Sequence, residues 1–153
     1  IGNGVALLAG RPEARDRLRE EPAGIPAAVE EILRFESPLQ SIGRIASEDL
    51  EIGGVKVPEG ASVSALIGAA NRDPEVFEAP ETFDPTREDN PHLAFGFGVH
   101  FCMGAALARL EGRIAFETLL ARFPRWEIDA APLVHRPSLG IRGLEALPIR
   151  LGG

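Results

Sequence analysis

The sequence predicts a mainly α-helical fold with small β-sheets, an α+β architecture. Two stretches, 25–35 and 103–123, carry apolar residues at helical spacing, and short β-prone runs punctuated by glycine and proline separate and follow them. The chain is 44% hydrophobic and 25% charged, which is ordinary for a globular protein. Its 153 residues are expected to form a single domain, 1–153, with a core of reasonable size.

The first part of the chain is predicted to be helical. Gly10 and Pro12 end one helix, and Pro12 also stands at a first-turn position of the next. A third, amphipathic helix carries Val29, Ile32 and Leu33 on one face. The predicted helices cover residues 5–9, 12–21 and 25–35, with a connector at 22–24.

Short strands are expected in the middle of the chain. The pair Gly53-Gly54 is a hairpin signal, and residues 58–60 mark a turn. The strand candidates are residues 42–46, 50–52, 55–57 and 61–67. A short helix within 69–77 and a proline-rich meander up to Pro91 follow, and a loop of that length in a compact domain usually has a function.

The longest helix is predicted over residues 103–123. Apolar residues recur along it at helical spacing and predict a buried stripe. The stripe consists of Met103, Leu107, Leu110 and Ile114, and continues through Phe116, Leu119 and Leu120. A second, small side of the helix, on which a flat ring could lie close, consists of Ala105, Ala106 and Ala108. Brief strands are expected among residues 125–128, 133–134, 141 and 147–151.

Charge and composition exclude some classes of function. Lys and Arg number 16 against 23 Asp and Glu, and the resulting net charge of −7 disfavours nucleic acid as a partner. No apolar run approaches the ~18 residues of a membrane span, and no leader peptide is evident. A single cysteine indicates a reducing compartment. We therefore expect a cytoplasmic protein that does not contact a membrane.

Residues 95–104 carry the candidate chemistry. Cys102, the only cysteine, stands there among glycines, aromatic residues and a histidine, directly before the longest helix. Amides at a helix N-terminus favour negative charge and hence a thiolate, and glycine allows close approach and positive φ. A flat apolar ligand with a metal at its centre would need this combination.

Other interpretations of Cys102 are weaker. A lone cysteine is most often an inert, buried small side chain. A zinc site would need clustered ligands, whereas the other soft ligands are the scattered His92, His100 and His135. A cysteine nucleophile with His100 as its base lacks a third orienting group. A nucleotide-binding turn lacks its third glycine.

The pattern Phe95-Gly96-x-Gly98-x-His100-x-Cys102-x-Gly104 resembles the haem-binding loop of the cytochrome P-450 family, with every fixed position filled. The resemblance implies haem b (iron protoporphyrin IX) as cofactor and Cys102 as the axial thiolate ligand of its iron. It implies that Arg44 and His100 neutralise the haem propionates and that Phe95 screens the sulfur. The implied cofactor-binding residues are Arg44, Phe95, Gly96, His100, Cys102, Gly104 and Ala108.

Glu31 and Arg34 lie three residues apart and so share a helix face. Spacing alone favours a surface ion pair worth about 0–1 kcal/mol. The two residues also resemble the family's Glu-x-x-Arg pair, which is buried and braces the core beneath the haem loop. Thr82 stands where many members carry the arginine that completes this group, so either Arg72 or Arg87 is expected to supply that charge.

The implied activity is monooxygenation, in which O2 is activated and one oxygen is inserted into a small organic substrate. Arg109 and Arg113, four residues apart, are candidate docking charges for a ferredoxin-type redox partner. The chain begins at Ile1 and resembles only the C-terminal portion of the family's fold, so we expect the upstream half to be absent and the isolated chain to be inactive. The alternative is a non-catalytic haem-binding remnant, or a structural fragment that needs the missing N-terminal half.

Overall fold

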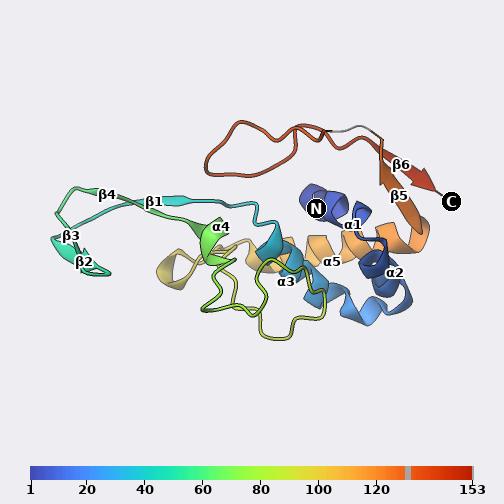
Figure 1. The fold of residues 1–153 in the computed structure, drawn as a ribbon, viewed down its shortest axis with the longest axis horizontal. Helices are drawn as coiled ribbons and strands as arrows, with labels where there is room; N and C mark the ends of the chain where they lie inside the picture. The colour runs from blue at the N-terminus through green and yellow to red at the C-terminus, as the bar shows by residue number, and fades with distance from the viewer. Residues whose placement is uncertain (130–131, 153) are drawn as a thin grey trace.

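The computed structural model describes residues 1–129 and 132–152. A helical body occupies the middle of the molecule, and a long β-ribbon runs away from one side of it (Figure 1). The body consists of α1 (Gly2–Ala9), α2 (Pro12–Glu20), α3 (Ile25–Phe35) and α5 (Ala105–Arg122). The C-terminal segment passes over the body as an extended loop before it ends beside α1 and α2 (Figure 1).

The core forms where α3 crosses α5. At the crossing Gly112 lets the helices approach, because a Cβ there would lie 3.1 Å from Cγ1 of Val29. Gly4 does the same for α1, where a Cβ would lie only 2.6 Å from Cζ of Phe116. The buried cluster comprises Val5, Leu7, Leu8, Leu18, Ile25, Ala28, Val29, Ile32, Phe116, Leu120 and Trp126.

The described part of the chain also contains three two-stranded antiparallel sheets. The strands β1 (Ile42–Ile45) and β4 (Ser62–Ala65) pair as the protruding ribbon. At its tip β2 (Leu50–Ile52) and β3 (Val55–Val57) form a hairpin, whose turn places Gly53 and Gly54 at φ 55° and 81°. Next to the helical body β5 (Arg125–Ile128) pairs with β6 (Ile149–Gly152).

Short helical turns connect these elements. They are η1 (Pro22–Gly24), α4 (Ile67–Ala70) and η2 (Gly98–His100). The predicted helices that correspond to α1, α2 and α3 are confirmed, with ends that differ by three residues or fewer. The predicted strands that correspond to β2, β3 and β5 are confirmed as well. The strand predicted over 61–67 stops at Ala65, and the helix predicted within 69–77 is shifted to Ile67–Ala70. Residues 133–134 do not form a strand.

The predicted buried stripe of α5 is wrong in its first half. Met103, Leu107, Leu110 and Ile114 are all exposed. The helix instead packs through Ala105, Gly112, Phe116 and Leu120, which lie on the opposite face at 3.6 residues per turn. The helix has apolar residues on two opposite faces, and the predicted stripe lies on the face that the helical body does not cover.

Among the residues that the structure describes, no helix is both long enough and apolar enough to cross a membrane.

Candidate functional site

Residues 95–104, which we call the cysteine loop, have a conformation that requires glycine. Gly96 and Gly98 take φ values of 74° and 62°, a region that side chains disfavour. A Cβ on Gly96 would also lie 3.2 Å from the carbonyl oxygen of His100. The loop then closes on itself, because the amide of Cys102 donates a hydrogen bond of 2.8 Å to the carbonyl of Phe95.

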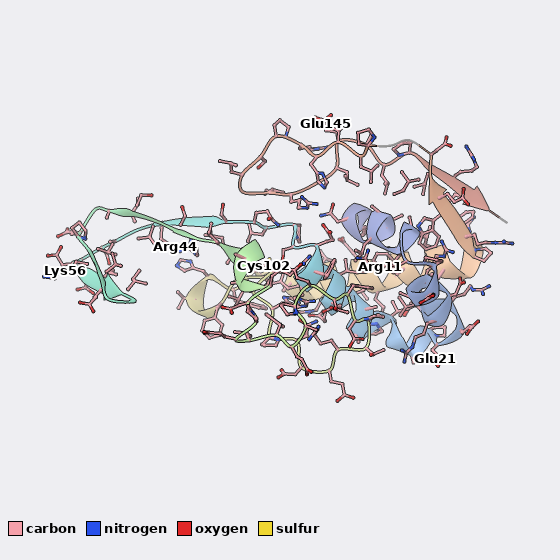
Figure 2. All side chains as sticks on the ribbon, in the orientation of Figure 1. Arg11, Glu21, Arg44, Lys56, Cys102 and Glu145 are labelled. Carbon is pink, nitrogen blue, oxygen red and sulfur yellow. The ribbon has the colours of Figure 1, made fainter. Side chains whose placement is uncertain are left out.

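Cys102 is exposed and lies just before the N-terminus of α5 (Figure 2). Its carbonyl accepts a hydrogen bond of 3.2 Å from the amide of Ala105, the first residue of the helix. Gly104 stands between them, and a Cβ there would come within 3.8 Å of the cysteine sulfur. The thiol is therefore accessible at the positive end of the longest helix.

Large apolar side chains close to Cys102 in sequence are largely exposed. Phe97 is 83% exposed, Val99 is 98% exposed and Met103 is fully exposed. Phe101, next to the cysteine, is about half exposed and meets Phe95 edge-on, with ring centroids 6.4 Å apart. Exposed apolar groups gathered in one loop mark a binding surface. An apolar, plate-like group such as haem fits this loop and its sulfur donor.

A pocket of about 220 Å³ lies beside the loop, between it and the β1–β4 ribbon. Arg44 of β1 and His100 of η2 both line it, together with Gly96 and Phe97. Within the described residues, Arg44 forms no ion pair and donates only to the carbonyl of its neighbour Gly43. The pocket thus brings two predicted propionate-binding side chains together and leaves the arginine's charge available for an anion.

The small side predicted for α5 is not one open face. Ala105 is 3% exposed and packed against the protein, so a ring cannot lie on it. Ala106 is exposed and Ala108 is half-buried. Ala105 faces inward because it belongs to the stripe that packs in the body, and this part of the prediction is wrong.

Glu31 and Arg34 form a fully buried ion pair, with both side chains 0% exposed. Arg34 Nε and Nη2 each donate to a Glu31 carboxylate oxygen at 2.8 Å. The remaining guanidinium donors reach three backbone carbonyls, those of Asn71, Pro80 and Thr82. The carboxylate in turn accepts from the amide of Asp84 and the side chain of Asn90. We call Glu31 and Arg34 with these partners the brace.

Arg87, rather than Arg72, lies next to Glu31. Its Nε is 3.3 Å from the Glu31 carboxylate, and its side chain is 11% exposed. Arg72 instead pairs with Glu81, donates to the carbonyl of Phe35 at 2.6 Å and lies over the Phe35 ring at 3.7 Å. The backbone of Thr82, not its side chain, completes the contacts of Arg34.

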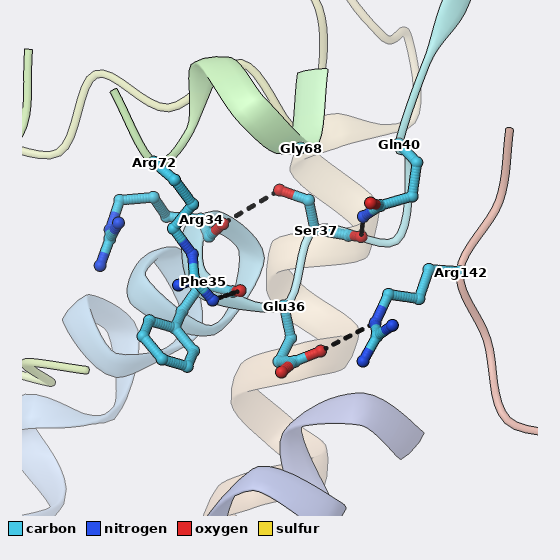
Figure 3. A pocket seen from close by; sticks show the side chains of 8 residues that line it. All are labelled: Arg34, Phe35, Glu36, Ser37, Gln40, Gly68, Arg72 and Arg142. Carbon is cyan, nitrogen blue, oxygen red and sulfur yellow. Dashed lines mark hydrogen bonds and ion pairs between the residues drawn. The ribbon is translucent and has the colours of Figure 1, made fainter. Parts of the chain in front are cut away.

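A polar pocket of about 180 Å³ opens at the C-terminal end of α3 (Figure 3). Two contacts line it: Gln40 donates to the carbonyl of Ser37, and Arg142 pairs with Glu36 at 3.2 Å. The second contact ties the C-terminal loop to α3 (Figure 3). Arg34 of the brace lines this pocket and no residue of 95–104 does, so the pocket belongs to the structural framework and not to the cysteine loop.

The predicted docking charges are both paired. Arg109 donates from Nε and Nη2 to Glu30 of α3, each at 2.8 Å, and Glu30 also lies 3.1 Å from Nε2 of His92. Burial raises the pKa of Glu30, but hydrogen bonds and charges from His92 and Arg109 outweigh it and hold that pKa at about 2. Arg113 pairs with Glu117 at 3.6 Å on the helix surface.

Three functional neighbours of the loop carry no signal in the sequence. Glu30 and His92 are 62 residues apart, and no motif links them. Asn71 is fully buried, accepts the amide of Leu93 at 2.7 Å and donates to the hydroxyl of Ser37 at 2.6 Å.

The fold and the loop define a protein in which an exposed cysteine lies just before the start of the longest helix, in a loop with exposed apolar side chains. In the described parts of the chain, no three His, Cys, Asp or Glu side chains gather as a metal-binding cluster. A family model described as Cytochrome P450 matches residues 25–137. The chain belongs to the cytochrome P450 family, whose members bind haem b.

Relatives and solved structures agree. The chain is 50% identical over 149 residues to the "Biotin biosynthesis cytochrome P450" of Bacillus subtilis, covering 97% of this chain and 38% of that protein. It is 48% identical to the "6-deoxyerythronolide B hydroxylase" of Saccharopolyspora erythraea, covering 100% and 38%. The structure of P450BioI in complex with a hexadec-9Z-enoic acid ligated acyl carrier protein matches with a TM-score of 0.96 at 49% identity, covering 99% and 40%.

The chain spans about 38% of the length of these curated relatives. The fold is therefore that of part of a cytochrome P450, mainly α with small sheets, as the sequence predicted.

Proposed function

We propose that this chain is the haem-binding, C-terminal portion of a cytochrome P450 monooxygenase, with Cys102 as the axial thiolate ligand of the haem iron. The observation that carries the proposal is an exposed cysteine, held by a glycine loop at the N-terminus of α5 among unpacked apolar side chains. Family membership supports the same assignment.

The other loop residues would hold and orient the cofactor. Arg44 and His100, which line one pocket, would bind the propionates. Phe95 would screen the sulfur from water, since its ring lies beside the loop it closes. Gly96, Gly104 and Ala108 would admit the macrocycle, because none of them carries bulk.

The bound haem would supply the redox and O2 chemistry of the reaction. The chain's own part would be to hold the sulfur in place and to exclude water from it. The substrate would be a small organic molecule, as the names of the biotin biosynthesis cytochrome P450 and the 6-deoxyerythronolide B hydroxylase indicate for those relatives. Composition and the single cysteine support action in the cytoplasm.

A ferredoxin-type redox partner would dock near Arg109 and Arg113, on the exposed surface of α5. Both arginines are about half exposed but already paired with Glu30 and Glu117. A partner's carboxylates would therefore have to compete with these two glutamates. Arg113 offers the weaker internal pair, at 3.6 Å, and is the stronger docking candidate of the two.

The 153-residue chain by itself would not turn over substrate. The apolar side chains of Leu107, Leu110 and Ile114 are uncovered in this structure, and the relatives are more than twice as long. The alternative function, a non-catalytic haem-binding or purely structural segment, agrees with the same two observations. Product formation by the purified chain with a redox system would contradict the expected inactivity and would also exclude that alternative.

Haem titration tests the proposal. The wild-type chain should take up haem and give a thiolate-type spectrum after reduction and addition of carbon monoxide. Cys102→Ser should lose that spectrum, because a serine hydroxyl is not ionised at neutral pH. Val134→Ser, which changes an exposed apolar residue of the C-terminal loop, serves as the control and should retain the spectrum. An unchanged spectrum in Cys102→Ser would contradict ligation through sulfur.

A further inference from the structure

Three segments meet at one partly buried carboxylate, that of Glu30, near the cysteine loop. Glu30 comes from α3, Arg109 from α5 and His92 from the segment that enters the loop. The guanidinium of Arg109 holds Glu30 through two parallel hydrogen bonds of 2.8 Å, the strongest geometry that an arginine and a carboxylate form. We call these three residues the clamp.

The clamp reaches the cysteine through Phe95. The guanidinium of Arg109 lies over the Phe95 ring, 4.7 Å from its centroid, and the ring of His92 is tilted against the same ring at 6.1 Å. The carbonyl of Phe95 accepts the amide of Cys102 at 2.8 Å. One side chain therefore separates the carboxylate network from the backbone that carries the sulfur.

His92 fixes the other side of this residue. Its Nδ1 accepts the amide of Ala94 at 3.2 Å, so Nε2 carries the proton that faces Glu30. Asn71 holds the amide of Leu93 at 2.7 Å. The two amides that precede Phe95 are thus both tied to side chains, whereas the ring of Phe95 lies under the guanidinium of Arg109.

We propose that Arg109 is a positioning residue: anchored by Glu30, it lies on the Phe95 ring and so fixes the carbonyl that orients the backbone of Cys102. The inference rests on the proposed role of Cys102 for its functional meaning. It gives Arg109 a task inside the chain that is separate from docking. A cation over an aromatic ring in a partly desolvated site is attracted to the ring face, so the contact is directional.

The test is hydrogen exchange of the Cys102 amide, measured residue by residue by NMR on the 153-residue chain. Arg109→Met removes both the paired hydrogen bonds to Glu30 and the cation over Phe95. It should speed exchange at the Cys102 amide roughly tenfold, because the loop can then open locally without breaking a charge-assisted contact. Glu30→Gln should act in the same direction, since it releases the guanidinium. Arg109→Lys keeps the positive charge but not the paired hydrogen bonds, so its exchange rate at the Cys102 amide should lie between those of wild type and Arg109→Met.

Arg122→Met is the matched control. Arg122 is also an arginine of α5 that lies over a phenylalanine, 5.6 Å from the Phe123 ring, but at the far end of the helix. It should leave Cys102 exchange unchanged. Fluorescence of Trp126, the only tryptophan and 1% exposed, reports in each variant whether the core is intact. Unchanged exchange at Cys102 in folded Arg109→Met and Glu30→Gln overturns the proposal.

A second measurement separates this inference from the proposed function. In haem-loaded chain, Arg109→Met should shift the carbonyl spectrum away from the thiolate type in part of the population, whereas Arg122→Met should not. If the wild-type chain takes up no haem, the proposed function fails while the exchange result still decides the role of Arg109. If haem binds and exchange is unaffected by Arg109→Met, the positioning role fails alone.

Discussion

The brace and the cysteine loop differ in which side chains the fold buries and which it exposes. The brace buries two opposite charges completely and supplies every carboxylate and guanidinium contact from within the chain. The loop leaves a thiol and three large apolar side chains in solvent. Polar groups are hidden in one region and apolar groups are displayed in the other, which reverses the usual rule for each residue type.

The difference separates stability from function. A buried ion pair is retained only when its partners are all present, because the desolvation cost would otherwise exceed the attraction. Exposed apolar groups contribute nothing to the chain's own core, so their presence in one loop indicates selection for an external ligand. Loss of stability should therefore concentrate at the brace, and loss of cofactor binding at the loop.

Arg34→Met should break the brace and have the largest effect. The substitution leaves the buried carboxylate of Glu31 with Arg87 as its one ion-pair partner among the described residues, which should lower the free energy of unfolding by about 3–5 kcal/mol. Urea unfolding followed by Trp126 fluorescence measures the change.

Arg17→Met provides the comparison for this experiment. Arg17 pairs with Glu21 at 3.7 Å, with both side chains more than half exposed. Its loss should cost about 0–1 kcal/mol. Equal effects from the two substitutions would show that burial of the brace does not determine its contribution.

Glu30→Gln sharpens the comparison, because the clamp lies between the two regions. A carboxyl whose pKa falls from 4.5 to about 2 on folding stabilises the folded chain above pH 4.5, and this stabilisation disappears as the pH drops through about 2. The difference in unfolding free energy between wild type and Glu30→Gln should therefore be present at pH 6 and shrink across that window. Acid titration of both proteins by circular dichroism measures it, and a difference independent of pH would be contrary to the paired geometry.

The double substitution Phe97→Ser, Val99→Ser should have the smallest effect on stability. Both residues are almost fully exposed, so the free energy of unfolding should change by less than about 0.5 kcal/mol. Leu120→Ala, at 2% exposure in the core, should cost about 2–5 kcal/mol. Haem affinity should show the reverse order, falling in the loop variant when titrated against wild type.

Local patterns predicted local structure well. The helix at Ile25–Phe35 follows from its apolar spacing, and the hairpin at Gly53-Gly54 from the glycine pair. The cysteine loop was recognisable because its glycines, aromatic residues and thiol lie within ten residues. Such features need no knowledge of the rest of the fold.

Features that join distant segments could not be predicted. Periodicity marked an apolar face on α5, but the choice between opposite faces depends on where Gly112 and Phe116 meet α3 and α1. The choice of Arg87 over Arg72 depends on how the meander folds back against Glu31. The pair of Glu30 with His92 spans 62 residues and leaves no local trace.

The contacts of Trp126 have a consequence for how the chain is made. Its indole nitrogen donates to the carbonyl of Val5, 121 residues earlier, and its own carbonyl accepts from Arg15, 111 residues earlier. A polypeptide leaves the ribosome from its N-terminus, so α1 and α2 emerge long before their last core partner is synthesised. Contacts between residues this far apart in sequence slow folding. Nascent chains that end before β5 would expose the apolar faces of α1 and α2, which share the core with Trp126, to proteases and chaperones.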